Sequence, residues 1–255
     1  LSLHPTKCKV QSSSASFTGS GLQQLAEGFH VKFVDPLEGF MVLGTKISLQ
    51  ELMGSETRHR IAAAWGKFNS LKSLLTHKDA SLKKRLALFD ATVGSCALWC
   101  SESWFLRRQE RLLFKTAQNK MLRTIVGIKR RPDEDYVPWV KRSTRAARLL
   151  AKQSGVRCWL CAHAKAKFMF ASRVVSRSRS SWVWKAAVWR DDAWQGVVDQ
   201  TSQRYIKKSR KGPWNCWEIE LVKSADAREG SNWLALASNS IAWRSLVNDF
   251  ADFCT

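Results

Sequence analysis

The chain has 255 residues, 45% of them hydrophobic, which excludes wholesale disorder and allows one large or two small domains, each with a core. Its 42 Lys and Arg residues outnumber its 21 Asp and Glu residues, so the net charge is +21. A charge of this size favours a polyanionic partner, above all nucleic acid, over a surface that is merely well solvated.

The positive charge is concentrated in the middle of the chain. Residues 56–151 carry 21 basic and 8 acidic side chains, and residues 152–211 carry 14 and 3. Residues 1–55 are neutral overall, and the stretch from 212 onward is slightly acidic. The middle of the chain is therefore the predicted binding region.

The sequence does not favour a membrane protein or a secreted protein. It contains no run of about 18 apolar residues, so no membrane span is predicted. Its seven cysteines are irregularly spaced and do not resemble a disulfide framework, and the first residues lack a secretion signal. We therefore expect a reducing compartment. The start at Leu1 rather than Met suggests a fragment of a longer reading frame.

The N-terminal part of the chain predicts a loop followed by a β-hairpin. Residues 11–21 are rich in Ser and Gly, which is typical of a flexible loop. Apolar residues alternate over residues 29–33, and turn-forming residues follow at 35–39. With a second strand over residues 40–47, we expect one hairpin spanning residues 29–48.

Helical periodicity begins at Glu56 and continues into two consecutive amphipathic helices over residues 81–127, with Ser81 or Asp79 as the N-cap. The first stripe after Glu56 consists of Ile61, Trp65, Phe68, Leu71 and Leu75. The stripe of the next helix consists of Leu82, Leu86, Phe89, Val93, Ala97, Cys100 and Trp104. The last helix buries Phe114, Ala117, Met121 and Ile125, carries a basic side, and ends at Gly127.

Two further helices are predicted downstream, over residues 137–153 and 155–176. The expected interior of the first is Val137, Val140, Ala147 and Leu150. The expected interior of the second is Trp159, Ala162, Ala166, Met169 and Phe170. A linker is expected at residues 176–181, and eight of the thirteen tryptophans follow it. These tryptophans could stack on bases, but packing in a core is the favoured interpretation. A second basic run at residues 207–211 is expected to be an exposed loop.

Cys158, Cys161 and His163 have a spacing that could bind zinc. A structural zinc site needs four ligands, and the remaining cysteines nearby in sequence do not supply one. A buried helix face is therefore favoured, and no metal site is predicted. Glycine-rich phosphate loops and nucleophile-elbow motifs are also absent from the sequence. The predicted fold is mainly α, with a small N-terminal β-hairpin, a helical bundle and a helical C-terminal region.

Several strings in residues 40–127, taken in order, resemble the reverse transcriptases of non-LTR (LINE-type) retrotransposons. Residues 40–44, Phe-Met-Val-Leu-Gly, resemble a motif near the palm–thumb junction, and Arg60-Ile61 resembles the helix that follows it. Residues 98–104, Leu-Trp-Cys-Ser-Glu-Ser-Trp, are similar to the family's Leu-Tyr-Gly-x-Glu-Thr-Trp. Residues 122–127, Leu-Arg-Thr-Ile-Val-Gly, are similar to its Leu-Arg-x-Ile-x-Gly ending.

Two weaker matches lie on either side of these strings. Residues 3–8, Leu-His-Pro-Thr-Lys-Cys, resemble the family's Leu-Asn-Pro-x-Lys-Thr, and residues 159–163 resemble its Trp-x-Gly-His string. The resemblance covers roughly residues 1–165. The chain departs from the family where Val42 replaces an aromatic residue and Cys100 replaces a glycine. The chain also lacks the family's paired metal-binding aspartates. Its Asp191-Asp192 pair lies far downstream in a different setting and does not correspond to them.

The resemblance implies a division of the chain into four parts. Residues 1–55 would be the end of the palm with a primer-grip-like hairpin, and residues 56–131 a helical thumb. Residues 132–180 would be post-thumb helices, and residues 181–255 a Trp-rich C-terminal region. The implied partners are an RNA template with its DNA primer, target DNA, and the missing palm and fingers of the same polyprotein. The implied location is a nuclear or cytoplasmic ribonucleoprotein.

The resemblance also implies roles for individual residues. Lys7 would be an accessory catalytic lysine near the incoming triphosphate, and Leu43 and Gly44 would steady the primer end. The complete polymerase would use Mg²⁺, whereas this chain without the aspartates is expected to be inactive and to need no cofactor. The residues expected to bind the duplex through its phosphates are Lys83, Lys84, Arg107, Arg108, Arg111, Lys115, Arg123, Lys129, Arg130 and Arg131.

Two other interpretations remain open. The chain could be a non-catalytic basic helical protein that binds RNA or DNA, for example a decayed relic of such an element. It could also be a translated remnant without activity.

Overall fold

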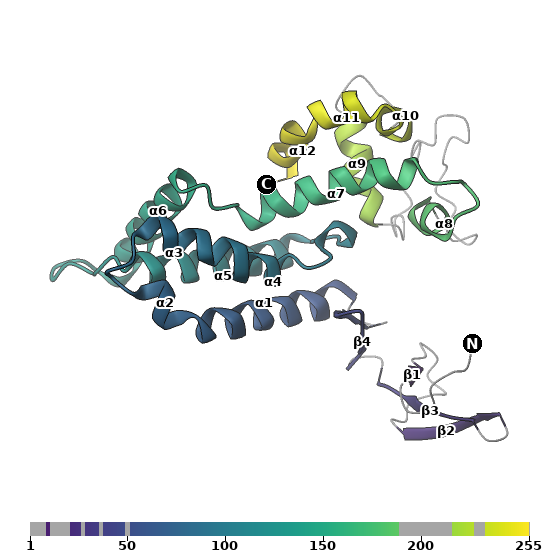
Figure 1. The fold of residues 1–255 in the computed structure, drawn as a ribbon, viewed down its shortest axis with the longest axis horizontal. Coiled ribbons are helices and arrows are strands. Elements are labelled where there is room, and N and C mark those ends of the chain that lie inside the picture. The colour runs from purple at the N-terminus through teal and green to yellow at the C-terminus, as the bar shows by residue number, and fades with distance from the viewer. Residues whose placement is uncertain are drawn as a thin grey trace. The chain divides into compact units, whose positions relative to one another are not determined.

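The computed structural model describes residues 9–10, 21–26, 29–35, 38–48, 52–188, 216–226 and 233–254. The chain divides into two compact units, the first comprising Leu1–Trp99 with Leu106–Arg148 and the second Cys100–Phe105 with Leu149–Thr255. The described part is mainly helical, with a few short strands near the N-terminus that include an antiparallel hairpin, which confirms the predicted fold class (Figure 1). No described helix is both long and apolar enough to cross a membrane.

The strands described in unit 1 are short and form two separate sheets. In the first sheet, β3 (Phe29–Phe33) lies between β1 (Lys9–Val10) and β2 (Gly21–Ala26), parallel to β1 and antiparallel to β2. In the second sheet, β4 (Phe40–Val42) pairs with β5 (Thr45–Ile47) in antiparallel orientation.

The hairpin predicted over residues 29–48 is therefore wrong. Residues 29–33 pair with residues 21–26, and residues 40–47, predicted as one strand, themselves form a hairpin. The reason is the turn at Leu43 and Gly44, whose φ angles of 49° and 84° reverse the chain within two residues. The loop predicted over residues 11–21 lies outside the described residues up to 20, and Gly21 starts β2.

Three antiparallel helical segments form the bundle of unit 1 (Figure 1). The first is α1 (Leu52–Ser70), which starts four residues before the predicted Glu56 and leads into the short α2 (Lys72–Thr76). The second is α3 (Leu82–Phe89), which Ser81 caps by accepting a hydrogen bond from the Lys84 amide; it continues through a π-helical turn (Asp90–Gly94) into α4 (Ser95–Ala97). The third is α5 (Arg108–Val126).

The core of the bundle is apolar and follows the predicted spacing. Its fully buried side chains include Phe68, Leu75, Leu86, Phe89, Val93, Ala97, Phe114, Met121 and Ile125. The rings of Phe68 and Phe89 meet edge to face with centroids 6.4 Å apart, which joins α1 to α3. Burial of each large side chain contributes about 1.5–3 kcal/mol, so this stripe fixes how the three segments face one another.

The helix predicted to extend from residue 81 to Trp104 ends earlier, at Ala97. Cys100 has a φ of 56°, in the left-handed region, and Ser101–Ser103 form a single 3-10 turn. Trp104 is buried as predicted, but from extended backbone. The apolar spacing of three and four residues continues past Ala97, so it predicted a longer helix. Such spacing carries no information about the left-handed backbone at Cys100.

The end of α5 agrees with the prediction. Gly127 has a φ of 70° and its amide donates to the Arg123 carbonyl oxygen at 2.9 Å, which closes the helix. The next helix, α6 (Tyr136–Gln153), starts within one residue of the predicted position. Ala147 is buried as expected, whereas Val137 is 59% exposed and does not belong to the interior.

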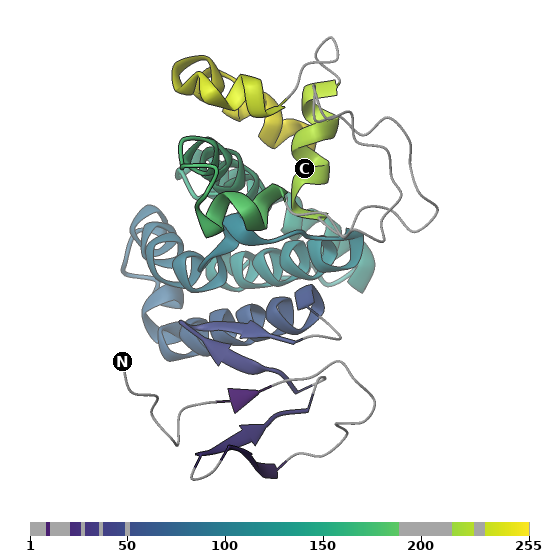
Figure 2. The ribbon, with the colours of Figure 1, turned by 90° about the vertical axis from the view of Figure 1, so that its right-hand side faces the viewer.

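Unit 2 is organised around α7 (Trp159–Val175), which starts four residues later than predicted. Shorter helices complete the unit: α8 (Trp182–Val188), α9 (Cys216–Asp226), α10 (Trp233–Ser238), α11 (Ser240–Ser245) and α12 (Val247–Cys254). The short helices α10, α11 and α12 pack along α7 (Figure 2). Of the interior predicted for α7 only Trp159 is buried; the helix instead buries His163, Ala164, Lys167, Phe168, Ala171 and Val174.

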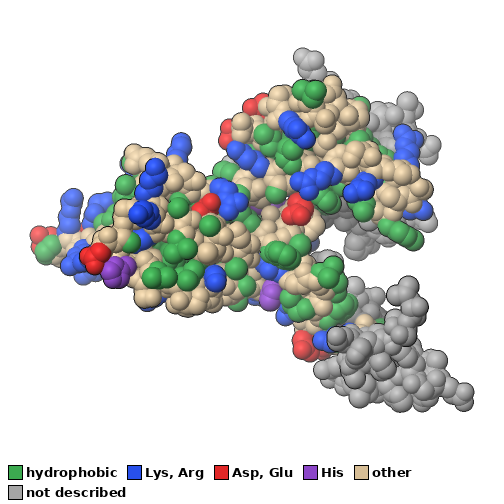
Figure 3. Space-filling model, in the orientation of Figure 1, with side chains coloured by type: hydrophobic (Ala, Val, Ile, Leu, Met, Phe, Trp, Pro, Cys, Tyr) green, Lys and Arg blue, Asp and Glu red, His purple; other side chains and the backbone are tan. Residues whose placement is uncertain are grey.

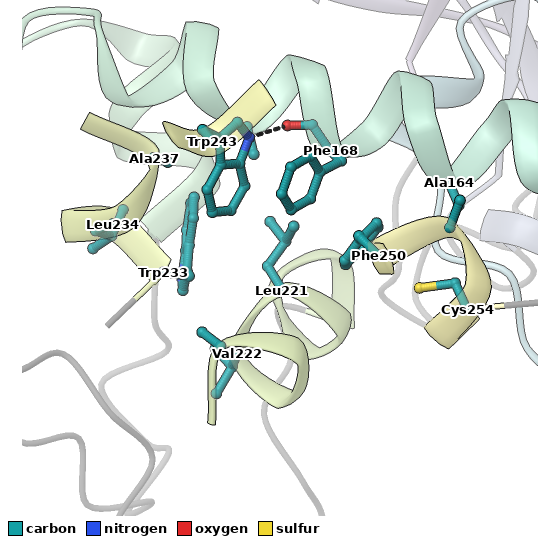
Figure 4. Close-up of a cluster of buried hydrophobic side chains, with 13 residues drawn as sticks. Ala164, Phe168, Leu221, Val222, Trp233, Leu234, Ala237, Trp243, Phe250 and Cys254 are labelled. Carbon is teal, nitrogen blue, oxygen red and sulfur yellow. Dashed lines mark hydrogen bonds between the residues drawn. The ribbon is translucent and has the colours of Figure 1, made fainter. Parts of the chain in front are cut away.

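The core of unit 2 centres on an aromatic stack between α7 and α11. The rings of Phe168 and Trp243 are parallel within 4°, with centroids 3.8 Å apart, and Trp243 Nε1 donates to the Phe168 carbonyl oxygen at 2.7 Å (Figure 4). Trp233 is also buried and donates to the buried Glu218. These two tryptophans confirm the packing interpretation, whereas Trp182 is 83% exposed. Trp189, Trp194, Trp214 and the basic run at 207–211 lie outside the described residues.

Candidate nucleic-acid interface

The β4–β5 hairpin presents an apolar tip to solvent. Its two-residue turn places Leu43 at the apex with 89% of its surface exposed, and Met41 is 47% exposed beside it. Apolar side chains at a hairpin apex gain nothing from the fold of this unit, since they contact little of it. The exposed apex is therefore available to contact a ligand.

A buried ion pair on α1 holds this turn in place. Arg60 donates through Nε to Glu56 Oε1 at 2.6 Å and through Nη2 to the Gly44 carbonyl oxygen. The other carboxylate oxygen of Glu56 accepts the backbone amide of Lys46 at 2.5 Å. The Glu56 and Arg60 side chains are only 1% and 7% exposed, so these interactions act in a low-dielectric setting. The hairpin is thus bound to the first turns of α1.

Trp99 also supports the turn. Its Nε1 donates to the Leu43 carbonyl oxygen at 3.3 Å. A Cβ atom on Gly44 would lie 3.2 Å from the same nitrogen, so a side chain there would push the indole away. The absence of a side chain at Gly44 thus allows the indole of Trp99 to lie close to the Gly44 backbone. Trp99 was not among the predicted site residues.

Eight of the ten cations predicted to bind the duplex are exposed. They are Lys83, Lys84, Arg107, Arg108, Lys115, Lys129, Arg130 and Arg131. The other two are partly buried and hold the fold: Arg111 donates to the Leu106 carbonyl oxygen at 3.0 Å, and Arg123 donates to Thr144 Oγ1 at 2.8 Å. A guanidinium group has five donors, so the bond to Thr144 occupies only part of the capacity of Arg123.

Arg85, which lies beside two of the predicted cations, has a structural role. It donates to the carbonyl oxygens of Leu75, Ala80 and Ile125 at 2.8–3.2 Å. These bonds tie the start of α3 to the end of α5. They bring Lys83 and Lys84 to the same end of the bundle as residues 129–131.

The opposite end of the bundle carries the hairpin together with Arg107 and Arg108. The chain runs from α3 to Trp99, which contacts the hairpin, and then into the start of α5. At 1.5 Å per residue, the 19 residues of α5 span about 28 Å. The predicted cations therefore form two groups at the two ends of α5, with Lys115 between them.

A row of cations on α6 was missed by the sequence prediction. Lys141, Arg145 and Arg148 are all exposed and stand four and three residues apart on the helix. Their spacing is visible in the sequence, although they lie outside the strings that resemble the reverse transcriptases. In Figure 3, Lys and Arg side chains stand over α6 and the connection that leads into it.

The connection between α5 and α6 is folded onto α6 by specific bonds. Trp139 Nε1 donates to the Ile128 carbonyl oxygen at 3.1 Å, and Arg142 donates to the Lys129 carbonyl oxygen at 3.2 Å. Arg142 also grips Glu134 through two bonds of 2.6 and 2.7 Å. The hydrogen bond from Arg142 lowers the pKa of Glu134 to about 2. The basic connection therefore has a defined backbone.

The remaining predictions concern Lys7 and the zinc-like spacing. Lys7 lies outside the described residues. His163 is buried, donates from Nδ1 to the Ser101 carbonyl oxygen at 2.8 Å, and stacks against Trp104, which confirms a packing role. Cys158 is exposed at the start of α7. Within the described ranges, no group of three or more His, Cys, Asp and Glu side chains could hold a metal ion.

Comparison of this chain with protein-family models, with curated proteins and with solved structures finds no match. Its function is therefore inferred from the residues described above.

Proposed function

We propose that this chain is the template–primer-binding part of an RNA-directed DNA polymerase of the non-LTR retrotransposon class. The observation that carries the proposal is the apolar Leu43–Gly44 turn, held by the buried Arg60–Glu56 pair at one end of a bundle that exposes cations along its length. The bundle binds the duplex, and the hairpin steadies the primer end.

The hairpin has the properties that a primer-end contact requires. Its apex is apolar and exposed, so it can pack against a sugar or a terminal base without reading sequence. Its backbone is fixed by Arg60, Glu56 and Trp99, so little conformational freedom is lost when a primer binds. A surface that binds nucleic acid only through its charge would not need an apolar hairpin apex with a fixed backbone.

The backbone at Cys100 supports the resemblance in residues 98–104. The family carries a glycine at this position of the string, and Cys100 has a left-handed φ of 56°. Glycine is the residue that adopts this region most readily. The residue has changed, but the conformation is the one that a glycine would allow.

The cations suit a duplex that lies along the bundle. The span of about 28 Å between the two groups corresponds to roughly eight base pairs at 3.4 Å each. Phosphate contacts of this kind position a duplex and carry no sequence information, as DNA synthesis on templates of any sequence requires. We therefore assign the exposed cations to template–primer binding.

The chemical step needs groups other than these residues. Two-metal nucleotidyl transfer requires close carboxylates to hold Mg²⁺, and among the described residues no group of three or more His, Cys, Asp and Glu side chains could hold a metal ion. The proposed contribution of this chain is to hold and orient the substrate.

The proposal is tested by measuring the affinity of a labelled RNA–DNA hybrid for charge-reversed variants. In one variant Lys83, Lys84, Arg108 and Lys115 are changed to Glu. The control makes the same charge change at Lys165, Arg173, Arg177 and Arg179, four exposed cations of unit 2. We expect the first variant to bind at least about tenfold more weakly and the control to change little. Equal losses in both variants would contradict a defined interface. If only the first variant loses affinity but cross-linking does not place the primer end at the hairpin, the chain would instead be a non-catalytic RNA- or DNA-binding protein.

A further inference from the structure

Helix α6 carries positive charge that nothing on the helix itself offsets. Its 18 residues include Lys141, Arg142, Arg145, Arg148 and Lys152 and no Asp or Glu. Only Arg142 has an acidic partner, Glu134, among the ion pairs of the described residues. Like charges three or four residues apart destabilise a helix by about 0.2–0.5 kcal/mol per pair. This row therefore lowers the stability of the helix, and a negatively charged partner would offset the repulsion.

Three of these cations share one narrow face of unit 1. Lys141, Arg145 and Arg148 lie within about 60° of the helix surface at 100° per residue, and all three are exposed. Along the helix axis they span about 10 Å. Arg142 projects from another side and is held by Glu134 and the Lys129 carbonyl oxygen.

A fourth cation reaches this face from α5. Arg123 Nη1 donates to the hydroxyl of Thr144 at 2.8 Å, and Thr144 lies three residues after Lys141 and four before Arg148. Thr144 therefore stands beside the row and fixes the Arg123 guanidinium next to it. The bond to Thr144 uses only part of the five donors of that guanidinium, so Arg123 adds its charge beside the row of exposed cations.

We propose that Arg123, Lys141, Arg145 and Arg148 form a phosphate-binding track, with Thr144 as its positioning residue, for the part of the template–primer duplex that lies away from the primer end. Arg123 is close to the C-terminal end of α5, whereas the hairpin and Arg108 belong to the other end. The track would meet a duplex only beyond roughly eight base pairs from its primer end. This inference rests on the proposed function for the position of the primer end.

The length of the duplex provides the test. Binding of the 255-residue chain is measured with RNA–DNA hybrid stems of about 6 and about 14 base pairs, chosen to fall on either side of the roughly eight base pairs that α5 spans, each closed by a loop so that both are stable. The variant replaces Lys141, Arg145 and Arg148 with Glu, and the control makes the same change at Lys165, Arg173 and Arg177 of unit 2. Thermal unfolding of each variant verifies that the helices remain folded, and replacement by Gln provides a milder variant.

The α6 variant should bind the long stem about tenfold more weakly and the short stem within about twofold of the unchanged chain. Thr144→Val should weaken long-stem binding by about twofold to threefold, and Thr144→Ser should restore it, because the hydroxyl holds Arg123. Equal losses for both stems, or no loss for either, would overturn the inference. The α3–α5 variant separates this failure from failure of the proposed function, because that variant should weaken binding of both stems.

Discussion

Arg60 donates a hydrogen bond to the carbonyl oxygen of Gly44, sixteen residues earlier in the chain. The bond joins the first helix of the bundle to the apex of the β4–β5 hairpin. Glu56 lies one helical turn before Arg60 and completes the junction by accepting the Lys46 amide. An exposed hairpin is thereby made part of a packed helical unit.

Loss of the Arg60 guanidinium should destabilise unit 1 strongly. Arg60→Met leaves the Glu56 carboxylate buried without its partner, and breaking a buried ion pair on one side costs about 3–5 kcal/mol. Urea unfolding followed by tryptophan fluorescence would measure the change. Lys67→Met on the exposed side of the same helix is the matched control and should change stability by less than about 0.5 kcal/mol. Similar values for the two variants would show that the junction does not hold the hairpin.

Glycine substitutions at two cysteines should affect stability differently. Cys100 has left-handed backbone, where a non-glycine residue costs about 1–2 kcal/mol, so Cys100→Gly should leave stability unchanged or raise it by up to about 1 kcal/mol. Cys96 lies in α4 with a partly buried side chain, so Cys96→Gly should lower stability by about 1 kcal/mol through lost packing of the side chain and the lower helix propensity of glycine. Both are measured by thermal unfolding under reducing conditions. Destabilisation at position 100 as large as that at position 96 would rule out the left-handed turn.

Glu134 should titrate far below an ordinary glutamate. Its pKa in the folded chain is lowered to about 2, chiefly by the hydrogen bond from Arg142. A depressed pKa means that the carboxylate stabilises the fold fully above pH about 4.5, and that this contribution is lost as the pH falls towards 2. Carboxyl ¹³C chemical shifts would follow the titration. Arg142→Met should return the pKa of Glu134 towards its usual range. An unchanged titration in that variant would contradict the pairing.

The helices of unit 1 were predictable because their apolar residues recur at helical spacing and their ends carry recognisable caps. Phe114, Ala117, Met121 and Ile125 are buried as predicted, and Gly127 ends α5. The hairpin between 40 and 47 was not predictable by alternation, because its turn is made of Leu43 and Gly44, and a leucine with positive φ has no signature in sequence.

Spacing also cannot tell which cations are used by the fold. Lys84 and Arg85 are neighbours in sequence, yet Lys84 is exposed while Arg85 donates to three carbonyl oxygens. Arg123 was expected to bind duplex phosphates, and its bond to Thr144 on the next helix could not be predicted. Such partners come from residues 21 or 40 positions away, and only the folded chain brings them together.

Binding of an RNA–DNA hybrid should depend steeply on salt. If all eight exposed cations of the predicted set contact phosphates, the slope of log affinity against log salt concentration should be about −6 to −7. Reversing Lys83, Lys84, Arg108 and Lys115 should make the slope shallower by about 3 to 4. An identical slope in the variant would indicate that these four side chains make no direct contacts with phosphates.

The orientation of the primer end tests the central claim most directly. A photoreactive nucleotide is placed either at the 3′ end of the primer or about eight base pairs upstream, and the cross-linked residues are mapped by mass spectrometry. The proposed arrangement predicts that the 3′-end probe labels the hairpin around Leu43 and the neighbouring Trp99, and that the upstream probe labels residues 129–131 or α6. The same labelled residues from both probes, with no preference for the hairpin at the primer end, would contradict it.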